Sequence, residues 1–548
     1  MTTFIGTAAG YIDLLTKVDG HLTAQGHASG ASFTGVGNGR IRGLGGTVGG
    51  YIGVSATVLE TITITFSSAT AFSVSGSVTG ALGSGTVGTD FTSSRVSFRI
   101  VAGSTAFASG DIFRLNMTPK WTRHRLSGMG NTGDGFSSML TGAAELVDGD
   151  ATGTAASTTA FPATATWQMS VDSEVRSLRI QCGATAGRGP ATFSLDWSND
   201  GTSWTTIQTW TGVGSWAANE ARIFAVSSPV ARRWWRVNVT AGQSSTLELW
   251  ELRACGDAAG TWPLDNNSAG VQAVWQSPGP DGATPAFHGV FTSVVPASDV
   301  WNWRVTGFRF WPDQASNPSL INVANATPPK SLPLTKTLSI AYWLIVSGSR
   351  YVLLVRISGI YMAVYSGFIL PYEAPADYPW PMAVAAPTEI DGLRWDSING
   401  GFRNFYDPGT NSSGSSGPGG LSVMQPNGVW REFCNRNGGT GEGNGLAPSD
   451  TQRGGAWPYL GQHNSSVQQV ARFRDCLDGT LAMFPVVLFV APHTGFDGVV
   501  LGELDGAYCM SGFGNAAEAL TVDGAVDVIS WPNVFRTSRN NFGGIALD

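Results

Sequence analysis

Short runs of alternating apolar residues, each ended by a glycine-rich turn, recur through most of the sequence. Ile62, Ile64 and Phe66 alternate with polar residues, and residues 96–100 repeat the pattern after another turn. Because successive side chains of a strand point to opposite faces, this two-residue period predicts half-buried β-strands. The 72 glycines supply the tight turns that short strands need. The pattern predicts an all-β, multidomain chain of antiparallel β-sandwiches or jelly rolls with few short helices.

Charged residues are scarce in this chain. They make up 13% of the sequence, against about 25% in an ordinary globular protein. Because the cores of permanent interfaces are depleted in charge, we expect other subunits to cover part of the surface, in a trimer or hexamer. The net charge is −7, and the densest basic stretches, Lys120–Arg125 and Arg232–Arg236, are short. Binding of nucleic acid depends on clustered Lys and Arg, so no nucleic-acid partner is expected.

The N-terminal stretch MTTFIGTAAGYIDLLTKVDG has neither the basic region nor the apolar region of a signal peptide. The longest apolar stretch, around Met483–Ala491, is shorter than the roughly 18 residues that suggest a membrane-crossing helix, so no membrane span is expected. An extracellular type of composition without an export signal favours a protein that leaves the cell by lysis. This predicts a virion protein that is assembled in the host cytoplasm.

Composition shifts along the chain predict its division into segments. These are an N-terminal helix plus β-sandwich that serves attachment (1–126), a linker (127–160), a jelly roll (161–256) and an aromatic-rich β domain (257–548). The helix is expected over residues 11–26, where apolar residues recur at helical spacing: Ile12, Leu15, Val18 and Leu22. Since a lone amphipathic helix must bury its apolar stripe, we expect it to dock on a neighbouring subunit.

Other elements can be placed in the later segments. In the C-terminal part we expect a hairpin over 338–358, a strand over 361–368, a second helix over 466–477 and a buried strand over 486–490. Residues 161–256 carry a closely spaced series of strands, which is typical of a sandwich or jelly roll. The expected strands are Trp167–Val171, Val175–Cys182, Ala191–Trp197, Trp204–Trp210, Ala221–Val226, Trp234–Val239 and Leu247–Leu252.

Three successive stretches of this segment, SNDGTSWTTIQTW, ARRWWRVNVT and LELWELRAC, resemble the discoidin, or coagulation-factor type C, family of galactose-binding-like domains. The resemblance implies a jelly roll whose loops at one end carry the ligand. Trp210 and Trp216 flank such a loop, Thr211–Ser215, and are the candidate glycan-binding residues, because exposed aromatic faces stack on sugar rings. We favour the other interpretation, in which the tryptophans form the core or subunit contacts, with Trp210 as a cap and the following residues in the core: Trp197, Trp204, Trp234 and Trp235.

Arginines surround the tryptophan pair at 234–235. Arg232, Arg233 and Arg236 are expected either to bracket that pair through cation–π contacts or to be ordinary charges at a strand edge.

A second resemblance concerns the C-terminal half. GFILPY (367–372) and DYPWP (377–381) are similar to a recurrent block in large virion proteins of tailed bacteriophages. That group's C-terminal block resembles LGELDG (501–506), GFGN (512–515) and NVFRT (533–537). The resemblance implies a structural protein of the tail tip or baseplate, with copies of itself and other tail proteins as partners. Two alternatives stay open: a receptor-binding tail fibre protein that grips host cell-surface glycan, and a polysaccharide depolymerase.

Signatures of catalysis are missing, so we expect no enzyme activity. The sequence has no GxSxG elbow, phosphate-binding loop or HExxH motif. Paired carboxylates remain open, because the two acids of a glycosidase lie far apart in sequence. The candidates are Glu432, Asp475, Glu503 and Asp505, and the alternative for Asp505 is a turn with Gly506.

Metal ligands and cofactor motifs are not apparent either. The six histidines are isolated, and the five cysteines show no CxxC spacing, so neither a metal site nor a cofactor is expected. Cys182 and Cys255 are expected to be buried free thiols, with a disulfide between them as the alternative.

Overall fold

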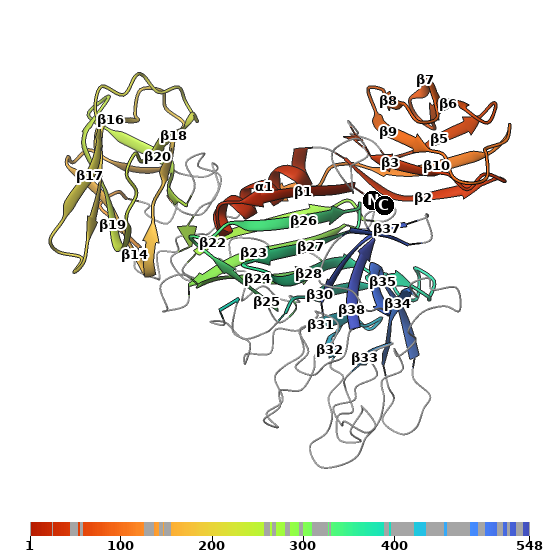
Figure 1. The fold of residues 1–548 in the computed structure, drawn as a ribbon. Coiled ribbons are helices and arrows are strands. Elements are labelled where there is room, and N and C mark those ends of the chain that lie inside the picture. The colour runs from red at the N-terminus through yellow and green to blue at the C-terminus, as the bar shows by residue number, and fades with distance from the viewer. Residues whose placement is uncertain are drawn as a thin grey trace, which may run out of the picture.

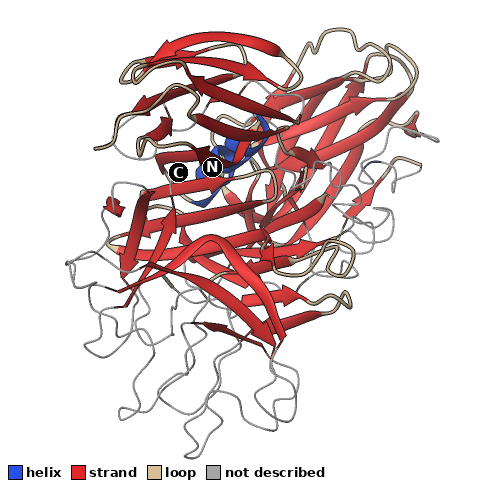
Figure 2. Ribbon diagram, turned by 90° about the vertical axis from the view of Figure 1, so that its right-hand side faces the viewer, coloured by secondary structure: helices blue, strands red, loops and turns tan. Residues whose placement is uncertain are grey.

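A computed structural model gives the three-dimensional structure of the chain. The described residues are 2–24, 26–43, 53–54, 59–124, 136–141, 146, 155–256, 264–265, 270–279, 285–294, 300–309, 327, 330–387, 394–395, 421–433, 454–457, 483–490, 499–511, 519–522, 526–532 and 541–546. Strands in six sheets and one helix form the regular structure of these residues, which confirms the all-β prediction (Figures 1 and 2). Strand pairs are antiparallel throughout, except for a parallel bridge between β32 and β33.

The N-terminal sandwich, residues 27–118, packs two sheets around a phenylalanine-rich core that includes Phe66, Phe98 and Phe113. Its alternating pattern produces the expected strands, because β5 and β9 bury every second residue. The first sheet contains β2 (His27–Thr34), β10 (Ile112–Thr118), β5 (Glu60–Phe66), β6 (Ala71–Gly76) and β7 (Gly80–Thr86). The second contains β3 (Arg40–Gly43), β9 (Val96–Val101), β4 (Gly53–Val54) and β8 (Asp90–Thr92).

The sandwich module, residues 136–255, contains every strand predicted for this segment. Its five-stranded sheet has the order β12 (Phe136–Ser138), β14 (Ala163–Glu174), β19 (Ala231–Gly242), β16 (Pro190–Ser198) and β17 (Thr205–Trp210). Its four-stranded sheet has the order β13 (Ala156–Thr158), β20 (Leu247–Cys255), β15 (Ser177–Cys182) and β18 (Ala221–Ala225). Two short stretches of the predicted linker, β12 and β13, pair into these sheets.

The central body combines two further sheets. The six-stranded sheet contains β11 (Thr122–His124), β21 (Leu264–Asp265), β22 (Gly270–Ser277), β23 (Ala286–Val294), β24 (Val300–Phe308) and β25 (Lys330–Thr335). The fourteen-stranded sheet contains β1 (Thr2–Ala8), β26 (Ile340–Val346), β27 (Arg350–Ile357), β28 (Ile360–Phe368), β29 (Leu370–Pro371), β30 (Met382–Ala385), β31 (Leu421–Met424), β32 (Trp430–Phe433), β33 (Gly454–Trp457), β34 (Met483–Val490), β35 (Val499–Ser511), β36 (Ala519–Val522), β37 (Val526–Pro532) and β38 (Asn541–Ala546).

Several predictions for this body are confirmed. Strands β26 and β27 form the expected hairpin over 338–358, β28 follows it, and β34 contains the predicted strand at 486–490. The second expected helix, at 466–477, lies outside the described residues. The domain boundaries stay predictions, although the structure shows that strand β1, from the first predicted segment, pairs with β26 of the last.

Helix α1 (Tyr11–Ala24) confirms the first predicted helix, but its expected docking on another subunit is wrong. Its apolar stripe is buried within the chain itself, since Leu14, Leu15 and Val18 are fully inaccessible to solvent. The helix packs against β1, β26 and β11, and Tyr11 stacks on Trp301 with ring centroids 4.5 Å apart. The sequence predicts an apolar helix face that must be buried, and strands distant in sequence bury it.

Candidate functional site

The predicted glycan-binding loop connects the two sheets of the sandwich module. Strand β17 ends at Trp210 in the five-stranded sheet, and β18 begins at Ala221 in the four-stranded sheet. The chain between them turns with Gly212 and Asn219 at positive φ, both at 61°. The loop, residues 211–220, therefore lies at one end of the sandwich, as the resemblance implied.

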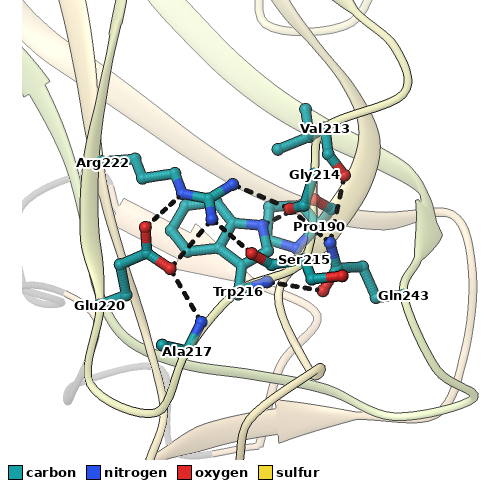
Figure 3. A network of polar contacts seen from close by, with 9 residues as sticks. All are labelled: Pro190, Val213, Gly214, Ser215, Trp216, Ala217, Glu220, Arg222 and Gln243. Atoms are coloured by element: carbon teal, nitrogen blue, oxygen red, sulfur yellow. Dashed lines mark hydrogen bonds and ion pairs between the residues drawn. The ribbon is translucent and has the colours of Figure 1, made fainter.

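Trp216 does not present its indole to solvent. Only 2% of the residue is exposed, and its indole Nε1 donates a hydrogen bond of 3.0 Å to the carbonyl of Pro190. Its backbone N–H donates to Gln243 Oε1 at 3.0 Å (Figure 3). The expectation of an exposed aromatic cleft is therefore wrong for Trp216, which anchors the loop to the sandwich.

Arg222 closes a polar network over this anchor. Its guanidinium lies 4.3 Å from the Trp216 ring centroid and donates to Glu220 at 2.7 and 2.9 Å (Figure 3). The same guanidinium donates to the carbonyls of Gly214 and Ser215 at 2.8 and 2.5 Å. The hydrogen bond from Arg222 to Glu220, followed by the one from the Ala217 backbone N–H, lowers the pKa of the Glu220 carboxyl. A loop with its carbonyls bound in this way is held in one shape.

Trp210 is half-buried and caps the core, as the second reading of the tryptophans predicted. Its ring stacks on Phe193 with centroids 5.0 Å apart, and it meets Phe224 edge-on at 5.9 Å. Of the two candidate glycan-binding residues, Trp210 is thus the one with an accessible part.

The other tryptophans of the module divide between its inside and its outside. Trp235 is fully buried in the core, and Trp197 packs partly buried against it. The prediction that Trp204 and Trp234 also fill the core is wrong, because both are half-exposed and stand outside the core cluster. Adjacent residues of a strand face opposite sides, so Trp234 and Trp235 cannot both point inward.

Two of the three arginines, Arg232 and Arg236, stack on tryptophans outside the predicted pair. Arg232 lies 4.1 Å from the ring centroid of Trp197, and Arg236 lies 4.5 Å from that of Trp204. Both contacts are within the range of a cation–π interaction.

The candidate catalytic carboxylates that the structure describes are each bound by a neighbour. Asp505 accepts from Arg350 Nε at 2.7 Å, and Glu503 accepts from the hydroxyl of Tyr372. This hydrogen bond raises the pKa of Tyr372 to about 12. Asp505 lies within strand β35, so its interpretation as a turn residue is wrong. The side chain of Glu432 and the whole of Asp475 fall outside the described residues.

The cysteine prediction is confirmed for the described pair, since Cys182 and Cys255 are buried free thiols. Burial raises the pKa of the Cys182 thiol. The part of the chain that the structure describes contains no cluster of three or more His, Cys, Asp or Glu side chains suited to a metal ion. Nor do its helices include one long and apolar enough to cross a membrane.

Comparisons with known proteins reach only solved structures, since no protein-family model and no curated protein matches the chain. The family 32 carbohydrate-binding module of NanJ from C. perfringens, in complex with galactose, is 18% identical. It covers 21% of this chain and 89% of its own, with a TM-score of 0.19. An F5/8 type C domain from Bacteroides fragilis is 13% identical. The match covers 24% of this chain and 93% of that domain, with a TM-score of 0.20.

A fucolectin from striped bass serum is 11% identical and covers 40% of this chain and 83% of its own, with a TM-score of 0.18. Discoidin-type and carbohydrate-binding domains are thus among the structures to which this chain is similar. At TM-scores of 0.18 to 0.20, these likenesses carry no argument about what the chain binds.

Proposed function

We propose that this chain is a structural subunit of a tailed-bacteriophage particle, located at the tail tip or baseplate. It forms symmetric contacts with copies of itself and with other tail proteins, and it presents its sandwich module outward. It has no catalytic role, and it is assembled into the virion in the host cytoplasm.

The observation that carries this proposal is a strip of exposed apolar side chains along the paired strands β29 and β35. Leu370 is 51% exposed, Tyr372 55% and Val500 40%. The backbone N–H of Tyr372 donates to the carbonyl of Leu501, so the segment with Leu370 and Tyr372 lies directly beside the segment with Val500. Exposed apolar patches of this kind mark interaction surfaces. Leu370 and Tyr372 belong to the block that resembles phage virion proteins.

The arrangement of the sheets supports outward presentation. Figure 1 places β17 and β19 of the sandwich module at the edge of the molecule, away from the central body. Strand β20, in the other sheet, is buried at every position, whereas β17 is exposed or half-exposed along its length. The five-stranded sheet thus carries the more exposed strand and the four-stranded sheet the more covered one.

Light scattering on the purified full chain tests the proposal. We expect the mass of a trimer or hexamer at micromolar concentration, and dissociation of the Leu370→Glu variant, because a charge would be buried in the interface. Ile223→Glu is a matched control, since Ile223 is nearly as exposed as Leu370, at 49%, but lies on β18 of the sandwich module. A wild-type chain that stays monomeric across the concentration range would contradict the proposal.

A second candidate function is attachment to host cell-surface glycan through loop 211–220. The network around Arg222 favours it, because a loop held in one shape loses little conformational entropy on binding. In this case a glycan array detects binding by the wild-type chain, and Trp210→Ala weakens it. An array without any signal would exclude this candidate. The depolymerase alternative predicts new reducing ends when host polysaccharide is incubated with the protein.

A further inference from the structure

We infer that the outer face of the five-stranded sheet in the sandwich module is a carbohydrate-binding surface for a neutral sugar chain. Its central residues are Trp204, Trp234 and Arg236, which we call the platform. This inference goes beyond the structural role proposed above. It also places glycan recognition on a sheet face and not at loop 211–220.

Strand β19 carries two of the platform residues, because its side chains point alternately into the core and outward. Trp235, Val237 and Val239 point into the core and are at most 3% exposed. The residues between them therefore point outward: Trp234, Arg236 and Asn238. On the adjacent strand β16 their direct partners are Ser198, Asp196 and Ser194. The outer face thus carries aromatic and polar groups side by side.

The guanidinium of Arg236 is fixed in position. Its Nε and Nη2 donate to Asp196 Oδ2 at 3.0 and 2.7 Å, and its plane lies 4.5 Å from the Trp204 ring centroid. Asp196 is only 1% exposed, and its Oδ1 accepts from the hydroxyls of Ser194 and Thr206 at 2.9 and 2.8 Å. The bonds to Asp196 Oδ2 use Nε and Nη2, so the N–H groups of the third nitrogen, Nη1, can donate to a ligand.

Both tryptophans of the platform are positioned by the turn after β16. Asp200 Oδ1 accepts from the backbone N–H groups of Thr202 and Ser203, both at 2.8 Å, and these bonds lower the pKa of Asp200. Gly201, at a φ of 74°, lies against the Trp234 indole so closely that a Cβ would come within 3.0 Å of the ring. Trp204 follows the same turn. The rings are therefore held before any ligand arrives.

Neutral polar side chains surround the platform. Asn238 lies outward on β19 next to Arg236, but its Oδ1 is enclosed, with no hydrogen-bond partner among the described residues, so this atom is not offered to a ligand. The neighbouring outward positions of β14, which pair with β19, add neutral polar side chains: Thr164, Thr166 and Gln168.

These groups match the chemistry of a neutral carbohydrate. Indole faces pack on the apolar C–H faces of sugar rings, while a fixed guanidinium and an amide bond to ring hydroxyls. Asp196 neutralises Arg236, so the platform has no net charge from this pair and no preference for an acidic ligand. The sheet with the more exposed strand is also the sheet that carries the platform, with β17 and β19 at the molecular edge (Figure 1).

The test is a titration of the full chain with a panel of oligosaccharides. Neutral glucose, mannose and galactose oligomers are compared with an acidic galacturonate oligomer of the same length. We expect a neutral oligomer to bind the wild-type chain. Trp234→Ala and Arg236→Lys should each lower the affinity about tenfold, because each removes one stacking or planar contact. Trp343→Ala is the matched control, since Trp343 on β26 is also half-buried near an arginine, Arg356.

Trp204→Phe distinguishes loss of binding from loss of folding, because phenylalanine keeps an aromatic face beneath Arg236. We expect this variant to bind more tightly than Trp204→Ala, with equal melting temperatures for the two. Neutral-glycan binding that survives the platform variants but is lost in Trp210→Ala would overturn the platform and favour loop 211–220. Preference for the galacturonate oligomer, or no binding to the panel, would also overturn it, while leaving the subunit role untouched.

Discussion

At the residue scale, single carboxylates fix the geometry of the turns. Asp111 in the N-terminal sandwich is 2% exposed, and its carboxylate accepts backbone N–H groups of Val36, Gly37 and Ala108, each at 3.0 Å. A Cβ at Gly35 would lie 2.3 Å from Asp111 Oδ1, so the close approach depends on a glycine there. These hydrogen bonds hold the pKa of Asp111 below its ordinary value, with the Ala108 bond as the largest cause.

The lowered pKa of Asp111 predicts that the stability of the N-terminal sandwich depends on pH. A carboxyl whose pKa is lowered by folding stabilises the protein above its ordinary pKa of about 4, and this stability is lost as the pH falls through the lower, folded-state pKa. Protection factors of the amides in β5 and β10, which correct for the slower intrinsic exchange in acid, should therefore fall on acidification. Asp111→Asn should exchange faster than wild type at pH 7 and respond less to acid.

Asp90→Asn provides the control in the same sandwich. Asp90 forms an ion pair with Arg99 in which both side chains are about half exposed, and such pairs contribute little. If Asp111→Asn behaved like this control, the proposed role of Asp111 in holding the segments at Val36–Gly37 and Ala108 together would be wrong.

The tryptophans of the sandwich module show what the sequence reveals at this scale. Trp235 and the cap at Trp210 could be predicted, because the strand and its neighbours were recognised. Residue type alone favours the core for Trp204 and Trp234, but strand alternation requires Trp234 to face away from Trp235. The burial of Trp216 had no signal in the sequence, since it depends on Pro190 and Gln243 from other parts of the module.

At the element scale, helix α1 joins strands that lie far apart in the chain. His21 stacks on Phe4 of β1 with ring centroids 4.0 Å apart and hydrogen bonds to the Tyr342 hydroxyl of β26 at 3.0 Å. The strands and this helix could largely be predicted from the spacing of their apolar residues, because that spacing lies within each element and identifies its buried face. Their partners could not, because pairing depends on register across the whole chain.

Truncation of the helix stripe should destabilise the central body. Leu15 is fully buried, and removal of a buried leucine side chain typically costs about 2–5 kcal/mol through lost burial and a residual cavity. We expect Leu15→Ala to lower the free energy of unfolding in urea by an amount in this range. Thr16→Ala, at the exposed neighbouring position, should be nearly neutral. Equal effects of the two variants would mean that α1 does not pack as described.

Three histidines that are wholly or partly buried, His21, His27 and His288, predict sensitivity to mild acid. Burial lowers the pKa of His21 and His27 to about 4 and that of His288 to about 3. The unfolded chain binds these protons near pH 6.5 and the folded chain does not, so stability falls as the pH drops from about 6.5 to about 4.

Calorimetry at pH 7, 6 and 5 should show a declining melting temperature. His288→Gln removes one of the three groups and should flatten the decline, provided that Gln keeps hydrogen bonds to Ser277 and Ser366, which His288 contacts at 3.1 and 2.9 Å. A melting temperature that stays constant or rises over this range would contradict the neutral state of the buried histidines.

At the scale of the whole molecule, the chain combines a body, an N-terminal sandwich and an outward module. Low charge and abundant glycine indicated the all-β class, but neither could show that β1 pairs with β26 more than 300 residues away. Nor could they show which sheet of the sandwich module carries the more exposed strand. Those properties arise from packing between segments, and they place the apolar strip at Leu370 and the platform at Trp234 on different parts of the surface.

A density map of the assembled protein by electron cryomicroscopy tests this account most directly. We expect several copies related by symmetry, with Leu370 and Tyr372 covered by a neighbouring copy. The outer face of β19 and β17 should remain open to solvent. Single copies in solution, or an assembly in which the sheet with Trp234 is packed against a neighbour, would contradict the account.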